Sequence, residues 1–181
     1  MTAEAQERLA KVRLLLMDVD GVLTDGKLYN VPDPAGKMLE TKAFDSQDGI
    51  SLQWLHWYGI KTGLISGRIS PATAERAAQC KFSYVYQGHI EKIPILEEIL
   101  TDCKLTRDEV AYIGDDLTDV VVMRRVGVSF ATANARQEVR GVADFVTEVP
   151  GGQGAVREVA ELLLKAKGCW PEILRKYEIE V

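Results

Sequence analysis

The chain has 181 residues, of which 46% are hydrophobic and 27% are charged, a size and composition typical of one globular domain. Its formal net charge of −5 argues against a nucleic-acid-binding protein, because such proteins present basic surfaces to phosphates. The longest apolar run near the start, residues 14–17, is far shorter than the roughly 20 residues of a membrane-spanning helix. We therefore expect one domain over residues 1–181, with neither nucleic acid nor membrane as a partner.

The start of the chain also lacks the basic segment and apolar core of a signal peptide. The three cysteines, Cys80, Cys103 and Cys169, lie far apart in the sequence. An odd and sparse set of this kind indicates reduced thiols and not a disulfide framework or a zinc site. Together these features predict a cytoplasmic protein.

Apolar runs and amphipathic segments alternate along the chain. After a first helix at 3–11, we expect a strand at 13–17 and then two short strands, 27–31 and 38–44, that flank a Pro- and Gly-containing loop. These two strands predict a β-hairpin inserted over residues 26–46. The remaining expected strands are 61–65, 84–86, 110–113, 128–131 and 145–147, and the remaining helices are 48–58, 71–79, 91–102, 117–125 (closed by Gly127) and 154–167. Residues 168–181 are expected to form a C-terminal tail.

Repeated strand–helix alternation predicts an α/β fold with a mainly parallel sheet. In such sheets ligands bind beyond the carboxyl ends of the strands, so the polar residues that follow the apolar runs should meet in one place. These residues are Asp18, Asp20, Thr24, Ser66, Gly67, Arg68, Asp115, Asp116 and Asp119, with Lys92 further along the chain.

Several carboxylates at one sheet edge repel one another unless a cation or shared protons compensate. Carboxylate oxygens favour Mg²⁺, which often bridges to phosphate, and the hydroxyl of Ser66 and the ammonium of Lys92 complete a set of partners for a phosphate group. A carboxylate such as Asp18 can attack phosphorus, and an acid two residues later, Asp20, can exchange protons with the leaving group and with water. The pattern indicates phosphoryl transfer.

The segment Asp18–Asp25 resembles the first motif of the haloacid dehalogenase superfamily. Ser66, Lys92 and residues 114–119 resemble its second, third and fourth motifs, in the same order. Residues 44–49 and 151–158 also resemble the small-cap branch of that superfamily, which includes phosphatases of 2-keto-3-deoxy sugar acid phosphates such as 3-deoxy-D-manno-octulosonate 8-phosphate (KDO 8-phosphate). The resemblance implies a Rossmann-like three-layer fold, with a small β-hairpin insertion in place of a cap domain.

The resemblance also implies roles for individual residues. Asp18 would be the nucleophile and Asp20 the general acid and base. Asp18, Asp115 and the main-chain carbonyl of Asp20 would hold Mg²⁺, while Ser66 and Lys92 would bind phosphoryl oxygens. Members of this branch form homotetramers in which the hairpin of one subunit lies near a neighbour's active site. The expected substrate contacts are Thr24, Gly67, Arg68 and, from a neighbouring subunit, Arg76.

Some residues keep two interpretations. Asp116 is expected mainly as a helix N-cap, and Asp119 as a residue that orients Lys92 or the metal ligands, although a solvated surface position is equally compatible with the sequence. His89 has no assigned role, and His56 is expected in a packed position. The glycine-rich segment 151–154 is either a segment that closes over the sugar or a turn that begins a helix.

The leading hypothesis that the resemblance implies is a Mg²⁺-dependent phosphomonoesterase that hydrolyses a 2-keto-3-deoxy sugar acid phosphate, best guess KDO 8-phosphate, through an aspartyl-phosphate. Three alternatives to this hypothesis remain at this point. The substrate could be a related nine-carbon sialic-acid-type phosphate. The chain could be a signalling receiver domain, although a receiver lacks an acid two residues after its acceptor aspartate. It could also be a phosphatase-like scaffold without catalysis, although the set of catalytic residue types is complete.

Overall fold

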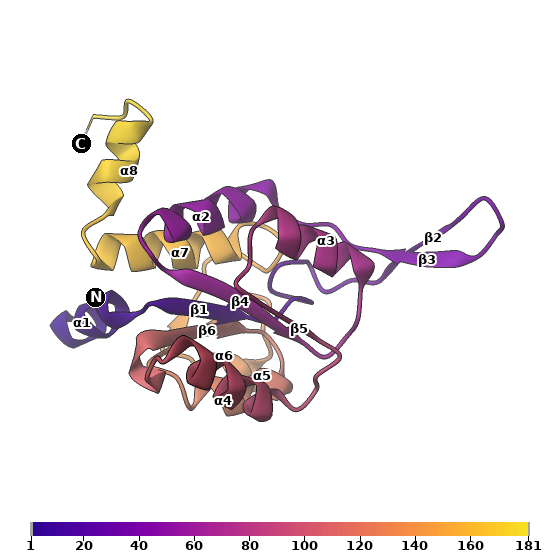
Figure 1. The fold of residues 1–181 in the computed structure, drawn as a ribbon, viewed down its shortest axis with the longest axis horizontal. Helices are drawn as coiled ribbons and strands as arrows, with labels where there is room; N and C mark the ends of the chain where they lie inside the picture. Colours follow the sequence, from indigo (N-terminus) through magenta and orange to yellow (C-terminus); the bar gives the residue numbers. More distant parts are fainter. Residues whose placement is uncertain (1, 181) are drawn as a thin grey trace.

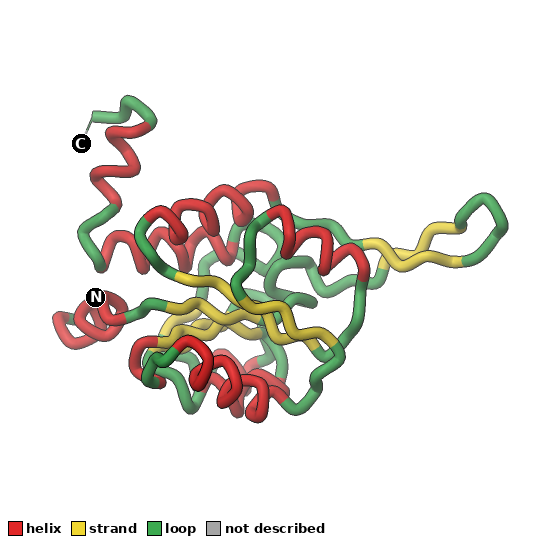
Figure 2. Tube along the Cα trace, in the orientation of Figure 1, coloured by secondary structure: helices red, strands yellow, loops and turns green. Residues whose placement is uncertain are grey.

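A computed structural model describes residues 2–180, in which six parallel strands form the central sheet (Figures 1 and 2). The spatial order is β5-β4-β1-β6-β7-β8, so β1 lies between two later strands. The predicted α/β fold with a parallel sheet is confirmed. The strands are β1 (Leu14–Met17), β4 (Lys61–Ser66), β5 (Tyr84–Gln87), β6 (Val110–Gly114), β7 (Val128–Ala131) and β8 (Phe145–Val146).

Helices cover both faces of the sheet and make the fold three-layered (Figure 1). The side chains of β1 show why, because Leu15 and Met17 face one hydrophobic core while Leu14 and Leu16 face the other. The first core is shared with α1 (Ala3–Lys11), α2 (Ser46–Trp57), α3 (Pro71–Gln79), α7 (Ala155–Ala166) and α8 (Trp170–Lys176). The second is shared with α4 (Lys92–Cys103), α5 (Leu117–Met123) and α6 (Gln137–Arg140).

The pairing register places the carboxyl ends of three strands at one level. Met17 of β1 pairs with Leu64 of β4 on one side and with Ile113 of β6 on the other. The residues that directly follow these positions therefore emerge at the same edge of the sheet. This edge is where the sequence predicts the site.

The inserted hairpin consists of β2 (Tyr29–Pro32) and β3 (Met38–Thr41), which pair antiparallel as a separate sheet. It projects away from the body of the protein (Figure 1). The carboxylate of Asp33 accepts hydrogen bonds from the amides of Ala35 and Lys37 and so closes the turn. Every residue of β2 is exposed, so the hairpin has no hydrophobic core of its own.

Three details of the sequence-based expectations were wrong. The segment expected as a C-terminal tail contains helix α8, which packs through buried Ile173 and places Trp170 edge-on against Trp54 at 5.8 Å. The short helix α6 and a 3-10 turn at Arg107–Glu109 were also not expected. Gly127 does not cap α5, which ends at Met123.

Gly127 instead lies against main chain, because a Cβ at this position would come within 2.4 Å of the carbonyl oxygen of Asp108. All three cysteines are free thiols. None of the helices described for residues 2–180 is long and apolar enough to cross a membrane.

Candidate active site

Asp18 begins the loop that follows β1, and its amide donates to the carbonyl oxygen of Ile113 at 3.1 Å. The chain then turns sharply at Gly21, where φ is +88°, a conformation that favours glycine. The hydroxyl of Thr24 stabilises this loop from within, donating to the carbonyl of Val19 and accepting from the amides of Gly21 and Gly26. The loop is thus held by hydrogen bonds within itself, and Asp18 is its first residue.

Lys92 is the first residue of α4 and is almost fully buried, with 1% of its side chain exposed. Its ammonium contacts Asp18 Oδ1 at 3.1 Å and Asp119 Oδ1 at 2.7 Å, and donates to the hydroxyl of Tyr112 at 3.1 Å. A buried charge is tolerated only when it is paired and hydrogen-bonded, and these partners meet that requirement. Lys92 is therefore fixed beside Asp18.

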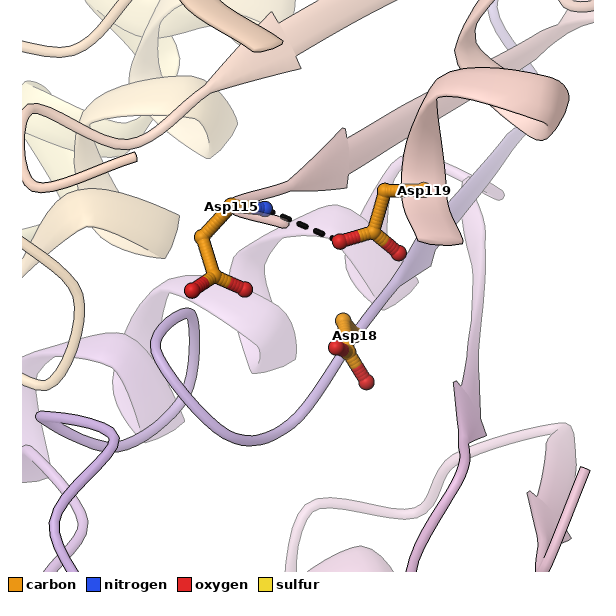
Figure 3. Close-up of side chains that lie close together, drawn as sticks. All are labelled: Asp18, Asp115 and Asp119. Atoms are coloured by element: carbon orange, nitrogen blue, oxygen red, sulfur yellow. Dashed lines mark hydrogen bonds between the residues drawn. The ribbon is translucent and has the colours of Figure 1, made fainter. Parts of the chain in front are cut away.

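Asp119 is fully buried and both of its carboxylate oxygens are occupied. Oδ1 accepts from Lys92 and from the hydroxyl of Tyr112, while Oδ2 accepts from the amides of Asp115 and Asp116 at 3.0 and 3.1 Å. Figure 3 shows the bond from the amide of Asp115. Asp119 therefore orients Lys92 and the start of α5, and its interpretation as an exposed surface residue was wrong.

The carboxylates of Asp18, Asp115 and Asp119 offer oxygens that all lie within 4.8 Å of one another (Figure 3). Asp119 is saturated by four donors, whereas Asp115 Oδ1 is buried and has no hydrogen-bond partner within residues 2–180. A buried oxygen of this kind is costly unless a ligand satisfies it. An all-oxygen set with one unpaired carboxylate oxygen fits a hard divalent cation such as Mg²⁺.

Burial and mutual repulsion shift the pKa values of these carboxylates. Burial raises the pKa of Asp115 to about 8, and the neighbouring charges of Asp119 and Asp18 add to this shift. Burial likewise raises the pKa of Asp18 to about 6, although the ammonium of Lys92 opposes the change. Burial alone would lower the pKa of Lys92, but the two carboxylates outweigh it and the pKa is raised. The site has a deficit of positive charge that a bound cation would remove.

A cavity of about 260 Å³ opens above these groups. Ser66 ends β4 beneath it, and its hydroxyl oxygen accepts the amide of Arg68 at 3.2 Å, which leaves the hydroxyl proton free to be donated. The cavity brings together most of the predicted site residues. It is lined by Asp18, Asp20, Gly26, Ser66, Gly67, Arg68, Ile90, Lys92, Asp115, Asp116 and Thr118.

Two predicted substrate contacts lie elsewhere. Thr24 is 2% exposed and bonds only within its loop, so the structure gives it a place in the loop and not in the cavity wall. Arg76 donates to the carbonyl of Asp45 at 2.7 Å and lines a separate cavity of about 330 Å³ between α2 and α3. A contact from Arg76 to substrate would therefore have to come from another copy of the chain.

Asp116, His89 and His56 each have a defined position in the structure. Asp116 is the N-cap of α5 and forms a capping box with Asp119, as expected. The ring of His89 lies edge-on to that of Tyr86 at 6.0 Å. His56 is half-buried and its Nε2 lies 2.9 Å from Thr62 Oγ1, a packed position as predicted.

The glycine-rich segment is a turn that begins α7 and packs against the Asp18 loop. The amide of Gly151 donates to Asn134 Oδ1 at 2.7 Å, and Asn134 in turn donates to the carbonyl of Gly21. The amide of Gly152 donates to the carbonyl of Val22 at 3.0 Å. These hydrogen bonds stabilise the loop that follows Asp18.

The sequence analysis missed three residues at the site. Tyr112 is a fully buried member of β6 whose hydroxyl joins Lys92 and Asp119, and a tyrosine inside an otherwise aliphatic strand was the available signal. Glu40 lies within β3 and contacts Arg68, and Lys42 directly follows β3 and contacts Asp20. Charged residues in a short exposed strand resemble an ordinary solvated surface, so no signal distinguished these two.

Comparisons with known proteins agree with this geometry. Residues 61–158 match the family of haloacid dehalogenase-like hydrolases. The chain is 38% identical over 168 residues to the KDO 8-phosphate phosphatase KdsC of Escherichia coli. The aligned region covers 93% of this chain and 87% of that protein. The chain therefore belongs to the haloacid dehalogenase-like hydrolases.

Two solved structures extend the comparison. The KDO 8-phosphate phosphatase of Yersinia pestis superimposes with a TM-score of 0.88 at 38% identity, covering 94% of this chain and 90% of that one. The enzyme of Moraxella catarrhalis, solved with magnesium, phosphate and KDO, gives a TM-score of 0.91 at 36% identity and covers 98% and 99% of the two chains. The similarity thus spans the whole fold, including the hairpin and the C-terminal segment.

Proposed function

We propose that this protein is a Mg²⁺-dependent phosphomonoesterase that hydrolyses KDO 8-phosphate to KDO and phosphate. The observation that carries the proposal is the buried contact between Lys92 and Asp18 at the floor of a cavity that Asp20 and Ser66 also line. This arrangement supplies a nucleophile, a cation for the phosphoryl group, a hydroxyl donor and a second acid. The substrate is proposed from the similarity of this chain to KDO 8-phosphate phosphatases, with which it shares more than a third of its residues over most of its length.

In the first step the carboxylate of Asp18 attacks phosphorus, and the ester oxygen leaves with a proton from Asp20. The ammonium of Lys92 and the hydroxyl of Ser66 hold the phosphoryl oxygens while charge shifts between them. In the second step Asp20 takes a proton from water as that water attacks the aspartyl-phosphate, which frees Asp18. When bound, Mg²⁺ supplies positive charge to the phosphoryl oxygens, and Asp18, Asp115 and the carbonyl of Asp20 would hold it.

Selection of the sugar acid is proposed to depend on Arg68 and Gly67 at the mouth of the cavity. The Arg68 side chain is 47% exposed, so its guanidinium can reach a carboxylate of the substrate. A nine-carbon sialic-acid-type phosphate is the alternative substrate, since it carries the same carboxylate and phosphate on a longer chain.

The protein is further proposed to be a cytoplasmic homotetramer in which the hairpin covers a neighbour's active site. Support comes from the apolar side chains that the hairpin and its first flanking residues expose, which are Leu28, Tyr29, Val31, Met38 and Leu39, each between 39% and 57% exposed. Exposed apolar groups at this density mark interaction surfaces. Light scattering tests the assembly, and a monomeric mass would contradict it.

The activity is tested by phosphate release with Mg²⁺ from KDO 8-phosphate, a nine-carbon sialic-type phosphate and a simple sugar phosphate. We expect a preference for KDO 8-phosphate that Asp18→Asn abolishes. Preference for another sugar acid would keep the chemistry and change the substrate. Absence of turnover with folded, metal-supplied protein would refute the enzyme and favour a scaffold.

A further inference from the structure

Lys42 lies directly after β3, at the base of the hairpin, and only 2% of its side chain is exposed. Its ammonium hydrogen-bonds to Asp20 Oδ1 and lies 3.7 Å from Glu40 Oε1. Lysines are seldom buried without a partner, and in this projecting hairpin Lys42 is turned inward. Its main contact is the carboxyl group that the mechanism uses for proton transfer.

Two further charges complete a ring around Asp20. Arg68 hydrogen-bonds to Glu40 Oε2 through Nη2, and its Nε lies 3.8 Å from Asp20 Oδ2. Glu40 Oε1 is buried without a hydrogen-bond partner among residues 2–180. We call Asp20, Glu40, Lys42 and Arg68 the Asp20 ring. It contains two acids and two cations, so no net charge is added at the mouth of the cavity.

Within residues 2–180, Lys42 is the only residue that forms a side-chain hydrogen bond with the Asp20 carboxylate. Asp20 is 21% exposed on a loop, where an unsupported carboxylate would sample several rotamers. Arg68 does not replace this support, because it lies beyond hydrogen-bond distance and is engaged by Glu40. The orientation of Asp20 therefore depends on Lys42.

We propose that Lys42 is a positioning residue that holds the Asp20 carboxyl group in the orientation needed for proton transfer to the leaving oxygen. This inference rests on the proposed function. An ammonium group can only donate hydrogen bonds, so the contact at Oδ1 places the transferable proton on Oδ2. As the bond from phosphorus to the ester oxygen breaks and the bond to Asp18 forms, the Oδ2 proton passes to the ester oxygen. Lys42 stays protonated throughout this step and transfers no proton.

Lys42→Met removes the contact while keeping most of the length of the side chain, and Lys42→Arg keeps a donor. The matched control is Lys61→Met at the first position of β4, an exposed lysine at the opposite end of that strand from Ser66. Each protein is assayed with Mg²⁺ on KDO 8-phosphate, on a neutral sugar phosphate and on p-nitrophenyl phosphate, and kcat/KM is compared. The nitrophenolate leaves without a proton, so its release does not need Asp20 as an acid, whereas both sugars leave as alkoxides that do need it.

General acid catalysis contributes about 10²- to 10⁴-fold, and Lys42→Met disorients the acid without removing it. We expect Lys42→Met to lower kcat/KM by about 10- to 100-fold on both sugar phosphates and less than about 3-fold on p-nitrophenyl phosphate. Lys42→Arg should recover most of the loss, and Lys61→Met should match the wild type. Thermal unfolding of each variant confirms that it is folded.

An equal loss on all three esters, or no loss on any, would overturn the positioning role. A loss confined to KDO 8-phosphate would also overturn it, because it would assign Lys42 to the carboxylate of the substrate. These outcomes leave the proposed function intact, since the wild-type protein turns over. Failure of the wild-type protein to hydrolyse any ester would instead overturn the proposed function, and the role of Lys42 with it.

Discussion

Gly151 is 133 positions after Asp18 in the sequence, yet we expect its replacement by alanine to impair catalysis. A Cβ at Gly151 would lie 1.9 Å from the carbonyl oxygen of Gly21, about 1.5 Å closer than an ordinary contact of 3.4 Å. The atoms that this Cβ would meet belong to the main chain of Gly21 and Val22 and cannot rotate away. The turn at 151–154 and the loop that follows Asp18 therefore have to separate. A separation of this size breaks the hydrogen bonds from Gly151 to Asn134 and from Gly152 to Val22.

Overpacking of this kind costs about 1–3 kcal/mol, and each lost hydrogen bond costs about 1 kcal/mol more. A total of about 3–5 kcal/mol lowers Tm by roughly 6–20 °C for a chain of this length. A displacement of roughly 1 Å at the reacting groups reduces the rate by about 10²-fold, so kcat/KM should fall by about that factor. Thermal unfolding and phosphate release measure the two effects.

Gly141→Ala is the matched control, because a Cβ there meets only ordinary contacts beginning at 3.4 Å and neither glycine has a positive φ. It should leave both kcat/KM and Tm close to the wild-type values. Wild-type Tm and kcat/KM in Gly151→Ala would refute the reasoning, since they would mean that the turn does not bear on the Asp18 loop.

Three other predictions concern buried carboxylates. Asp119→Ala leaves Lys92 with one carboxylate instead of two, and breaking a buried ion pair costs about 3–5 kcal/mol, so Tm and kcat should both fall. Burial raises the pKa of Asp48 from 3.8 to about 7; the folded state therefore binds this proton more tightly than the unfolded state, and stability decreases as pH rises between those values. In urea titrations at about pH 8, the free energy of unfolding of Asp48→Asn should be higher than that of the wild type, by at most about 4 kcal/mol. Burial raises the pKa of Asp115 to about 8, so its protonation competes with the binding of Mg²⁺. Addition of Mg²⁺ should therefore raise Tm more at about pH 8 than at about pH 6. Asp115→Asn should reduce that rise.

Each of these has an outcome that would contradict it. For Asp119→Ala it is an unchanged Tm. For Asp48→Asn it is a stability profile parallel to that of the wild type; asparagine suits this test because Oδ1 still accepts the amide of Arg157, while Oδ2 has no partner within residues 2–180. For Mg²⁺ it is the same Tm rise at both pH values, or a full rise in Asp115→Asn.

The sequence predicted the frame of the fold because buried parallel strands leave a strong local pattern. The run at 128–131 is mostly apolar and lies between Gly127 and Thr132, and it forms β7 with those bounds. Helix α3 begins at Pro71, a residue that favours the first position of a helix, although the hydroxyl of Ser70 forms no capping hydrogen bond. Helix α8 was missed because Trp170-Pro171 resembles a turn, and what holds the helix in place is contact with Trp54, which is distant in sequence.

At the site, residues that follow strands were predictable because the topology of a parallel sheet gathers them at one edge. What no local pattern could supply is the direction of each side chain. Thr24 turns into its own loop, Arg76 faces a different cavity, and Lys42 turns inward from a hairpin that is otherwise exposed. These directions follow from contacts between segments that are far apart in the chain.

The position of β1 in the sheet has a consequence for the order in which the protein is made. Asp18, the proposed nucleophile, directly follows β1, but one of the two neighbours of β1 is β6, which begins at Val110. Translation at about 5–20 residues per second takes roughly 5–20 s to cover the roughly 90 residues between them. During that interval the side of β1 that will meet β6 presents unpaired main-chain groups, which are a template for wrong pairing. A nascent chain of this protein therefore passes through a stage in which Asp18 has been synthesised but its neighbours Asp115 and Asp119 have not.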